Sequence, residues 1–190
     1  MSLISHYLDI HLLPDPELAP HHLTEALFTK LHLALAAMDT DAIGVSFPGY
    51  AKSPVQLGDQ LRLVGPADAL ALLLSTSWLG AMRDHIRLSA VLPVPAGVEH
   101  RHLRRVQAKS SPARLRRRQI KRHGLSEAEA LAQVPDSAAE RLRLPFVQVR
   151  SASTGQTFRL FLDLGPAQPS SSEGSFNAYG LSSTRTIPWF

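Results

Sequence analysis

Nine histidines and no cysteine set the limits on the chemistry that this sequence can perform. Without thiols there are no disulfides and no thiolate metal sites. The histidines also lack the spacing of zinc ligands: His21 and His22 precede an expected helix without a matching glutamate or cysteine pair, and His6 and His11 fall on opposite faces of an expected strand. The acidic residues are scattered singly along the chain, which does not favour a two-metal phosphodiesterase.

Histidine, hydroxyl groups and positive charge remain as candidate catalytic groups, because the sequence contains no Walker-type or dinucleotide-binding glycine loop. These groups suffice for RNA cleavage in which the ribose 2′-OH attacks its own adjacent phosphate. The substrate supplies the nucleophile, so the protein needs a base, groups that hold an in-line geometry and donors for the phosphorane charge. Histidine suits the base because it exchanges protons near neutral pH. DNA could bind, but it lacks the 2′-OH.

The positive charge is concentrated between Arg101 and Arg122. This segment holds eight arginines, two lysines and no acidic residue, whereas the rest of the chain carries 10 basic and 16 acidic residues. A mildly acidic body with one cationic segment is typical of a protein that binds a phosphate backbone. The alternative is a solvated helix with scattered counterions. Charge of a single sign argues against that alternative, because like charges at i,i+4 destabilise an unliganded helix.

A helix is predicted over residues 112–123 within this segment. Ser111 can cap it, Pro112 suits its first turn and Gly124 suits the position just past its end. Only Leu115 and Ile120 are large and apolar between these signals, so an anion is the better partner for most of the surface. One stripe at i, i+3, i+4, i+7 and i+8 contains Arg114, Arg117, Arg118, Lys121 and Arg122, and Arg116 lies off it.

The elements that must position these groups indicate an α+β protein. Strands are expected at 5–12, 42–48, 59–65 and 83–91, and helices at 19–39 and 66–75. In the first helix Leu23, Leu27, Leu31 and Leu35 form the four-residue stripe of an amphipathic helix. The order βαββαβ predicts a ferredoxin-like module that ends near residue 92.

The second half is expected to be organised differently. Residues 92–100, "LPVPAGVEH", have the proline and glycine content of a linker. Ser126 and Glu129 have the spacing of a capping box at the start of another helix. Two strands are expected in "PFVQVRSASTGQTFRLFLDLG", around a Ser-Thr-Gly turn.

Seven stretches, in order and with matching spacing, carry a resemblance to a known family. They are "HYLDIHLLPDPE", "LFTKLHLAL", "IGVSFP", "RVQAKSSPARLRRRQIKRHGLSEAEA", "LPFVQVRSASTGQTFRLF", "YGLSS" and "PWF". Together they resemble the type I-F CRISPR repeat-RNA-processing endoribonucleases. The resemblance implies a ferredoxin-like domain joined to a smaller domain whose arginine-rich helix lies in the major groove of a repeat hairpin. It also implies metal-independent cleavage 3′ of the stem, through 2′-OH attack and with a 2′,3′-cyclic phosphate product, followed by retention of the product in a surveillance complex.

The resemblance assigns catalytic roles to three residues. The histidine of "LHxAL" falls on His32, expected to be the general base; outside this motif, a histidine at that position is better explained as a residue that flanks the helix core. The serine of "RSxSTGQ" falls on Ser151, which would hold the ribose, although a strand-end serine needs no such role. The tyrosine of "YGLS" falls on Tyr179, which would orient the histidine. Ser153 and Thr154 match hydroxyls near the scissile region, and as turn residues they also have a structural explanation.

The resemblance also implies RNA contacts outside the helix. Arg105 and Gln107 match a pair that reads purine edges near the base of the stem, since arginine suits guanine and glutamine suits adenine; the alternative is a basic linker that touches phosphates. Phe158 would stack on the terminal base pair, although a core phenylalanine is the competing interpretation. The arginine stripe would recognise mainly the RNA backbone and the shape of the stem.

These expectations define the organisation and partners of the protein. Residues 1–94 would form the ferredoxin-like catalytic domain, and residues 95–190 a hairpin-binding α+β domain that carries helix 112–123. The partners would be the CRISPR repeat hairpin and other subunits of a type I-F complex, without metal or cofactor. The chain start lacks a signal peptide pattern and no apolar run reaches membrane-spanning length, so we expect a cytoplasmic protein. Two alternatives are a non-catalytic RNA-hairpin-binding subunit and a duplex-DNA-binding regulator.

Overall fold

The main sheet of the protein forms around its first strand. The computed structural model describes residues 3–107, 112–135, 142–150 and 155–190. The sheet has the order β2-β5-β1-β6, with β7 also paired to β1, and its pairs are antiparallel. Its strands are β1 (His6–Leu12), β2 (Gly44–Ser46), β5 (Gln60–Gly65), β6 (Ile86–Leu88) and β7 (Leu92–Pro93). The protein is therefore a mixed α+β structure with antiparallel sheets.

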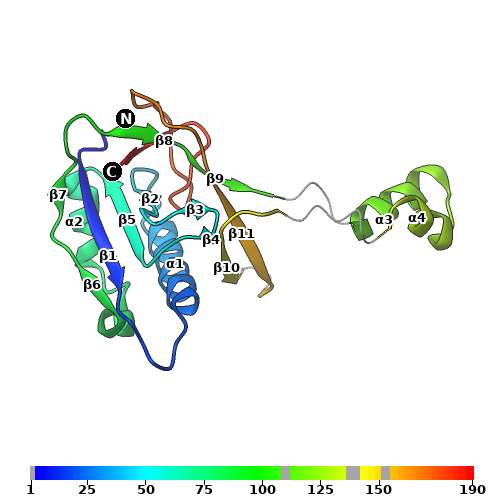
Figure 1. Cartoon of the computed structure of the whole chain (residues 1–190), viewed down its shortest axis with the longest axis horizontal. Helices are drawn as coiled ribbons and strands as arrows, with labels where there is room; N and C mark the ends of the chain where they lie inside the picture. The colour runs from blue at the N-terminus through cyan, green and yellow to red at the C-terminus, as the bar shows by residue number, and fades with distance from the viewer. Residues whose placement is uncertain (1–2, 108–111, 136–141, 151–154) are drawn as a thin grey trace. The chain divides into compact units, whose positions relative to one another are not determined.

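Two helices pack on this sheet, α1 (Pro20–Ala37) and α2 (Ala67–Ser75), and a short 3₁₀ helix, η1 (Gly80–His85), leads into β6 (Figure 1). The leucine stripe predicted for the first helix is confirmed: Leu23, Leu27, Leu31 and Leu35 are all buried. His32 follows buried Phe28 by four residues, so the two side chains lie on the row beside this stripe. His32 itself is half-buried.

A second sheet extends the same compact unit. It has the order β10-β11-β9, formed by β10 (Phe146–Arg150), β11 (Thr157–Leu164) and β9 (Leu103–Val106). Helix α1 packs against β10, and the hairpin of β3 (Ala51–Lys52) and β4 (Val55–Gln56) precedes β5. Buried Val147, Val149, Leu160 and Leu162 belong to the same core as α1 and the main sheet.

The predicted linker at 92–100 is wrong. Its first residues form β7, which pairs with β1, and its last residues begin β8 (Glu99–Arg101), which pairs with the C-terminal strand β12 (Ile187–Trp189; Figure 1). Pro93 is tolerated there because a short outer strand does not need every N–H for pairing. A two-residue pairing with a distant strand leaves no periodic pattern, so composition alone suggested a linker.

A buried ion pair fixes the C-terminal residue to the main sheet. The Arg62 guanidinium donates to both carboxylate oxygens of Asp9, at 2.7 and 3.0 Å, and to the backbone oxygen of Phe190 at 2.6 Å. Its Cζ also lies 3.8 Å from the centroid of the Phe190 ring and 4.8 Å from that of Tyr7. The chain end is therefore a structural part of the unit that contains the sheet.

The arginine-rich segment forms a compact unit of its own. Contacts divide the chain into Met1–Val106 with Leu144–Phe190, and Gln107–Arg143. The smaller unit contains α3 (Pro112–His123) and α4 (Glu127–Gln133). The predicted helix 112–123 is confirmed, as is the capping box of Ser126 and Glu129. Gly124 has φ +64° and donates its N–H to Ile120 O at 3.0 Å, the expected C-terminal signal.

These two units do not coincide with the predicted boundary after residue 94. That boundary separates a catalytic domain from a hairpin-binding domain, and it stays a prediction.

Over the residues that the structure describes, no helix combines the length and the apolar character that crossing a membrane requires.

Candidate functional site

His32 is held in one tautomer by a carbonyl from a distant loop. Its Nδ1 lies 2.8 Å from Ala178 O, and the imidazole is half-buried. A carbonyl oxygen only accepts hydrogen bonds, so Nδ1 must carry the hydrogen and donate it. In the neutral ring Nε2 is then the nitrogen with the free lone pair. The imidazole can accept a proton at Nε2 while its orientation is fixed at Nδ1.

Tyr179 lies flat against the same imidazole. The ring centroids of His32 and Tyr179 are 3.8 Å apart and the rings are within 9° of parallel. Tyr179 is also parallel to Phe28, with an interplanar angle of 10° and a centroid distance of 6.2 Å. Phe28 and His32 are one helical turn apart on α1, so one tyrosine ring can contact both. Stacking and the Nδ1 hydrogen bond together restrict both the tilt and the rotation of the imidazole.

An asparagine organises the loop that carries these contacts. Asn177 Oδ1 accepts the backbone N–H groups of Tyr179 at 2.9 Å and of Leu181 at 3.2 Å. Gly180 donates its N–H to Asn177 O at 2.8 Å, and its own carbonyl accepts Val45 N–H at 2.9 Å. The loop is therefore closed on itself and attached to β2, which fixes the Ala178 carbonyl relative to α1.

Glycine is required at position 180 for two reasons. Its φ is +70°, which L side chains rarely adopt, and a Cβ there would lie 2.7 Å from Val45 Cγ1. Gly44 on β2 meets a similar need, because a Cβ at that position would lie 2.5 Å from the Phe176 ring. Two glycines thus allow the segment from Phe176 to Gly180 to lie directly against β2.

Arg105 and Phe158, both predicted to contact RNA, lie together in the structure. Arg105 on β9 is exposed, and its Cζ is 5.3 Å from the centroid of the half-buried Phe158 ring on β11. Arg105 also lines a hollow with the Asn177 loop; the other lining residues are Arg104, Ser175, Phe176, Leu181, Ser182, Ser183 and Thr184. The hollow is polar, so one side chain predicted to read bases lies beside the loop that holds His32.

Four other residues were predicted to contribute to this region. Gln107 is exposed directly after β9. Ser151, Ser153 and Thr154 lie outside the described residues. The structure thus brings together His32 with Tyr179 and Arg105 with Phe158, and their proposed roles stay predictions.

The predicted stripe on α3 is exposed along its length. Its members are Arg114, Arg117, Arg118, Lys121 and Arg122. Arg116, off the stripe, is half-buried and donates from Nη1 to Val134 O at 3.0 Å, which ties α3 to the end of α4. Leu115 and Ile120 are half-buried. Helix α3 therefore uses one arginine and two apolar side chains for its own unit and presents the other cations to solvent.

Comparison with known proteins decides the family. The family model described as "CRISPR-associated protein (Cas_Csy4)" matches residues 7–190. The chain belongs to the Cas_Csy4 family. This Cas_Csy4 chain is 51% identical over 187 residues to a protein of Pseudomonas aeruginosa (strain UCBPP-PA14) named "CRISPR-associated endonuclease Cas6/Csy4", which covers 98% of the chain and 100% of the relative. A protein of Escherichia coli (strain UTI89 / UPEC) with the same name is 43% identical over the same coverage.

Sequence reasoning missed two contributors to the site of this Cas_Csy4 chain. The Ala178 carbonyl has no side-chain signal, and its hydrogen bond to His32 spans 146 residues. Asn177 had a weak signal, because asparagine side chains in turns often accept a hydrogen bond from the backbone two residues further on. Among the described residues no group of three or more His, Asp or Glu side chains is arranged to hold a metal ion.

Proposed function

We propose that this chain is an endoribonuclease that binds a CRISPR repeat hairpin and cleaves precursor CRISPR RNA 3′ of its stem. Membership of the Cas_Csy4 family and the two relatives named as endonucleases, both aligned over nearly the whole chain, support this proposal. The observation that carries it is the fixed orientation of His32, whose Nδ1 donates to Ala178 O and whose ring stacks on Tyr179.

His32 is the general base in this mechanism. Its Nε2 takes the proton from the ribose 2′-OH of the cleaved nucleotide. The 2′ oxygen then attacks the adjacent phosphate and expels the 5′ oxygen of the next nucleotide, which takes up a proton from solvent and leaves as a 5′-hydroxyl. The product ends in a 2′,3′-cyclic phosphate. We propose that no metal is needed, because the substrate brings its own nucleophile and the base is a preoriented imidazole. Tyr179 acts as a positioning residue through its ring.

Three hydroxyl residues complete the proposed site by resemblance to the family. Ser151 would hold the ribose in the in-line geometry, with Ser153 and Thr154 close to the scissile phosphate. All three belong to the segment between β10 and β11, and Phe158 lies on β11.

RNA binding is divided between the two units. The exposed stripe on α3 would contact the backbone of the stem, since five cations on one helix face match a line of phosphates. Arg105 and Gln107 would read base edges and Phe158 would stack on the terminal base pair, with Arg105 held over the same ring. Many charged contacts of this kind support retention of the product, and other type I-F subunits would then bind the loaded protein.

The first domain is best described as ferredoxin-like in this proposal. The strands of the βαββαβ order, β1, β2, β5 and β6, are arranged as β2-β5-β1-β6 with antiparallel pairing, which supports that description. Residues 1–94 would then form the catalytic domain, and residues 95–190 the hairpin-binding domain with the arginine-rich helix.

Replacement of the histidine tests the proposal directly. We expect His32→Ala to lose cleavage of the cognate repeat RNA while its affinity for the hairpin stays within about twofold of wild type, because the imidazole acts on one proton. Cleavage is followed on denaturing gels and binding by gel shift, with EDTA present throughout.

A 2′-deoxy substitution at the cleaved nucleotide is the matched substrate control, and the wild-type protein should bind this RNA and leave it intact. Cleavage of the deoxy substrate, or loss of wild-type activity in EDTA, contradicts the mechanism. If wild-type protein binds the repeat but never cuts it, the chain is a non-catalytic RNA-binding subunit.

A further inference from the structure

We propose a second RNA-binding surface on the outer face of the β10-β11-β9 sheet, which takes single-stranded RNA that flanks the hairpin. This outer-face site is defined by Arg104, Phe146, Arg159 and Asp163 of the sheet, with Lys52 of β3 and Arg101 of β8 beside them. The inference rests on the proposed function, because it assumes that the hairpin itself is bound elsewhere on the chain. It adds a contact for RNA outside the stem.

Strand alternation separates this face from the residues already assigned to the hairpin. Neighbouring side chains on a strand point to opposite faces of the sheet. The side chain of Arg104 therefore leaves β9 on the face opposite to Arg105 and reaches Asp163, although both arginines also line the hollow beside the Asn177 loop. On β11, Arg159, Phe161 and Asp163 face away from buried Leu160 and Leu162. The register places Arg104 opposite Asp163.

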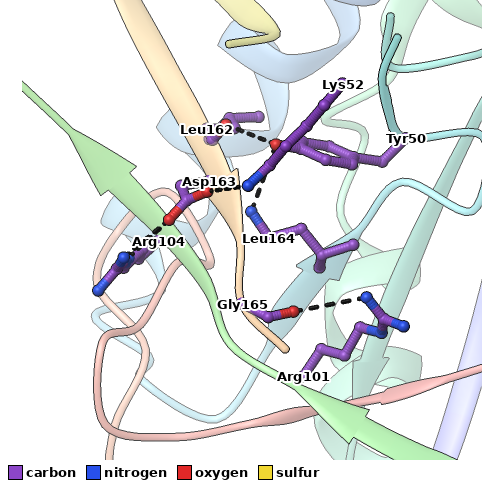
Figure 2. Close-up of polar contacts among 8 residues, drawn as sticks. All are labelled: Tyr50, Lys52, Arg101, Arg104, Leu162, Asp163, Leu164 and Gly165. Carbon is purple, nitrogen blue, oxygen red and sulfur yellow. Dashed lines mark hydrogen bonds and ion pairs between the residues drawn. The ribbon is translucent and has the colours of Figure 1, made fainter. Parts of the chain in front are cut away.

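One end of the outer-face site is a cationic cluster around a single carboxylate. Figure 2 shows Lys52 and Arg104 approaching Asp163 from opposite sides. Lys52 Nζ lies 2.8 Å from Asp163 Oδ1, and Arg104 donates to Oδ2 from Nη2 at 2.8 Å and from Nε at 3.1 Å. The Lys52 and Arg104 side chains are 54% and 53% exposed, whereas that of Asp163 is 14% exposed. The carboxylate thus positions two cations that remain open to solvent.

The charges of this cluster persist at neutral pH. Burial works to raise the pKa of Asp163, but hydrogen bonds from Lys52 and Arg104 and their positive charges outweigh it and hold that pKa below its usual value. The hydrogen bond with Asp163 raises the pKa of Lys52 above its usual value. Two cations and one anion therefore leave a net positive charge before Arg101 is counted.

Arg101 adds a cation whose donors are only weakly used. Its Nη1 lies 3.5 Å from Gly165 O and its Nη2 lies 3.7 Å from Oε2 of the exposed Glu99. Within the described residues its buried Nε has no hydrogen-bond partner. Arg101 lines one hollow with Lys52, Arg104, Asp163, Tyr50 and Trp189, and its Cζ is 5.5 Å from the Trp189 ring. A phosphate in this hollow would take up donors that the protein leaves underused.

The other end of the outer-face site is aromatic. Phe146 on β10 is directly opposite Phe161 on β11, with ring centroids 5.5 Å apart. Phe146 is 36% exposed, and Cζ of Arg159 lies 4.7 Å from its ring. Strand β11 connects this aromatic pair to the cluster, because Phe161 and Asp163 are two residues apart on the same face.

This combination favours single-stranded RNA over an acidic protein. Cations that follow the backbone and exposed aromatic rings on which bases stack are the two components of single-strand binding sites. An acidic peptide would use the cations but would gain little from a phenylalanine pair with an arginine over it. A duplex would keep its bases stacked and could not use the aromatic end.

The test compares hairpin RNA with and without a single-stranded flank of about ten nucleotides, which is within the range that such sites cover. The flank is placed 5′ or 3′ of the stem in separate probes, all with a 2′-deoxy cleavage position. We expect a flank on one side to tighten wild-type binding about tenfold. The variants are Lys52→Ala with Arg101→Ala, and separately Phe146→Ala, with exposed Arg87→Ala as the control.

Each variant should lose most of that tenfold gain and keep wild-type affinity for the bare hairpin. The Lys52→Ala/Arg101→Ala pair should also lower the slope of log K against log salt by about 1.4 for the flanked probe, the value for two lost single-strand phosphate contacts. Phe146→Ala should leave that slope unchanged. The exposed positions of Lys52 and Phe146 make loss of folding a minor concern, and thermal unfolding checks it.

Four results would overturn the inference. The first is a flank that adds no affinity, and the second is a variant that weakens bare-hairpin binding equally. The third is an Arg87→Ala variant that behaves like the others, and the fourth is displacement of the flank by polyglutamate as readily as by oligouridine. If wild-type protein does not bind the bare hairpin, the proposed function fails instead. The unstructured flank alone, as a separate probe, then still tests the outer-face site.

Discussion

At the scale of single residues, the site depends on how tightly His32 is oriented. One nitrogen is fixed by Ala178 O and one face by Tyr179, so the free lone pair has a defined direction. A base with this geometry pays less entropy when substrate arrives. The described contact between Tyr179 and His32 is made by the ring, which predicts that the ring matters more than the hydroxyl.

We therefore expect Tyr179→Phe to keep near wild-type single-turnover cleavage and Tyr179→Ala to lower it about tenfold. The tenfold figure corresponds to about 1.4 kcal/mol, at the upper end of the range for one aromatic contact. Hairpin affinity should be unchanged in both variants, since the change acts on imidazole orientation. An equal loss in both variants would assign the role to the hydroxyl and contradict the stacking argument.

At the scale of elements, the loop 176–181 supports the candidate site around His32. Its closure by Asn177 and its attachment to Val45 hold the carbonyl that His32 needs. Gly180 makes this possible through its positive φ and its close approach to β2. A change at Gly180 should therefore affect both stability and catalysis, although the residue itself has no chemistry.

Gly180→Ala is expected to destabilise the protein by about 1–3 kcal/mol through backbone strain, and to lower cleavage further by displacing the Ala178 carbonyl. Urea unfolding and single-turnover kinetics measure the two effects. Gly97→Ala is the matched control, because Gly97 has φ +73° with nothing within 4 Å of its added Cβ. It should share the strain and keep full activity; loss of activity in both variants would show that stability alone explains the effect.

The elements that sequence predicted best were those with local signals. Pro112 and Gly124 marked the ends of α3, the Ser126 capping box began α4, and the leucine stripe identified the buried face of α1. Signals of this kind lie within a few residues of the feature they specify. The short strands β7 and β8 were missed because their stabilising partners, β1 and β12, are distant in sequence.

The same contrast between local signals and distant partners applies to the candidate site. Helix α1 and the family resemblance pointed to His32. Its Ala178 partner could not be predicted, because every residue has a backbone carbonyl and the sequence does not mark the one that is used. The cluster of Lys52, Arg104 and Asp163 was missed for a related reason. It joins three segments, and only the pairing of β9 with β11 brings two of them together.

At the scale of the whole molecule, the proposed function assigns stem binding and chemistry to separate units. The smaller unit, Gln107–Arg143, contains the exposed stripe, and the larger unit contains His32, Tyr179 and their support. Because no residue of the stripe takes part in the proposed proton transfer, the two functions should respond independently to mutation. The proposed retention of the product would require this independence, since affinity must persist after the bond is broken.

Replacement of Arg117 and Arg118 by Ala tests that independence. Loss of two stem phosphate contacts should weaken hairpin binding and lower its salt slope by about 1.8, because each contact releases roughly 0.9 counterion on a duplex. Cleavage within the saturated complex should stay within about twofold of wild type. Arg83→Ala with Arg87→Ala, two exposed arginines of the larger unit, is the matched control and should change neither quantity. A large fall in the cleavage rate at saturating protein would mean that α3 also positions the scissile phosphate, and the separation of binding from chemistry would then be wrong.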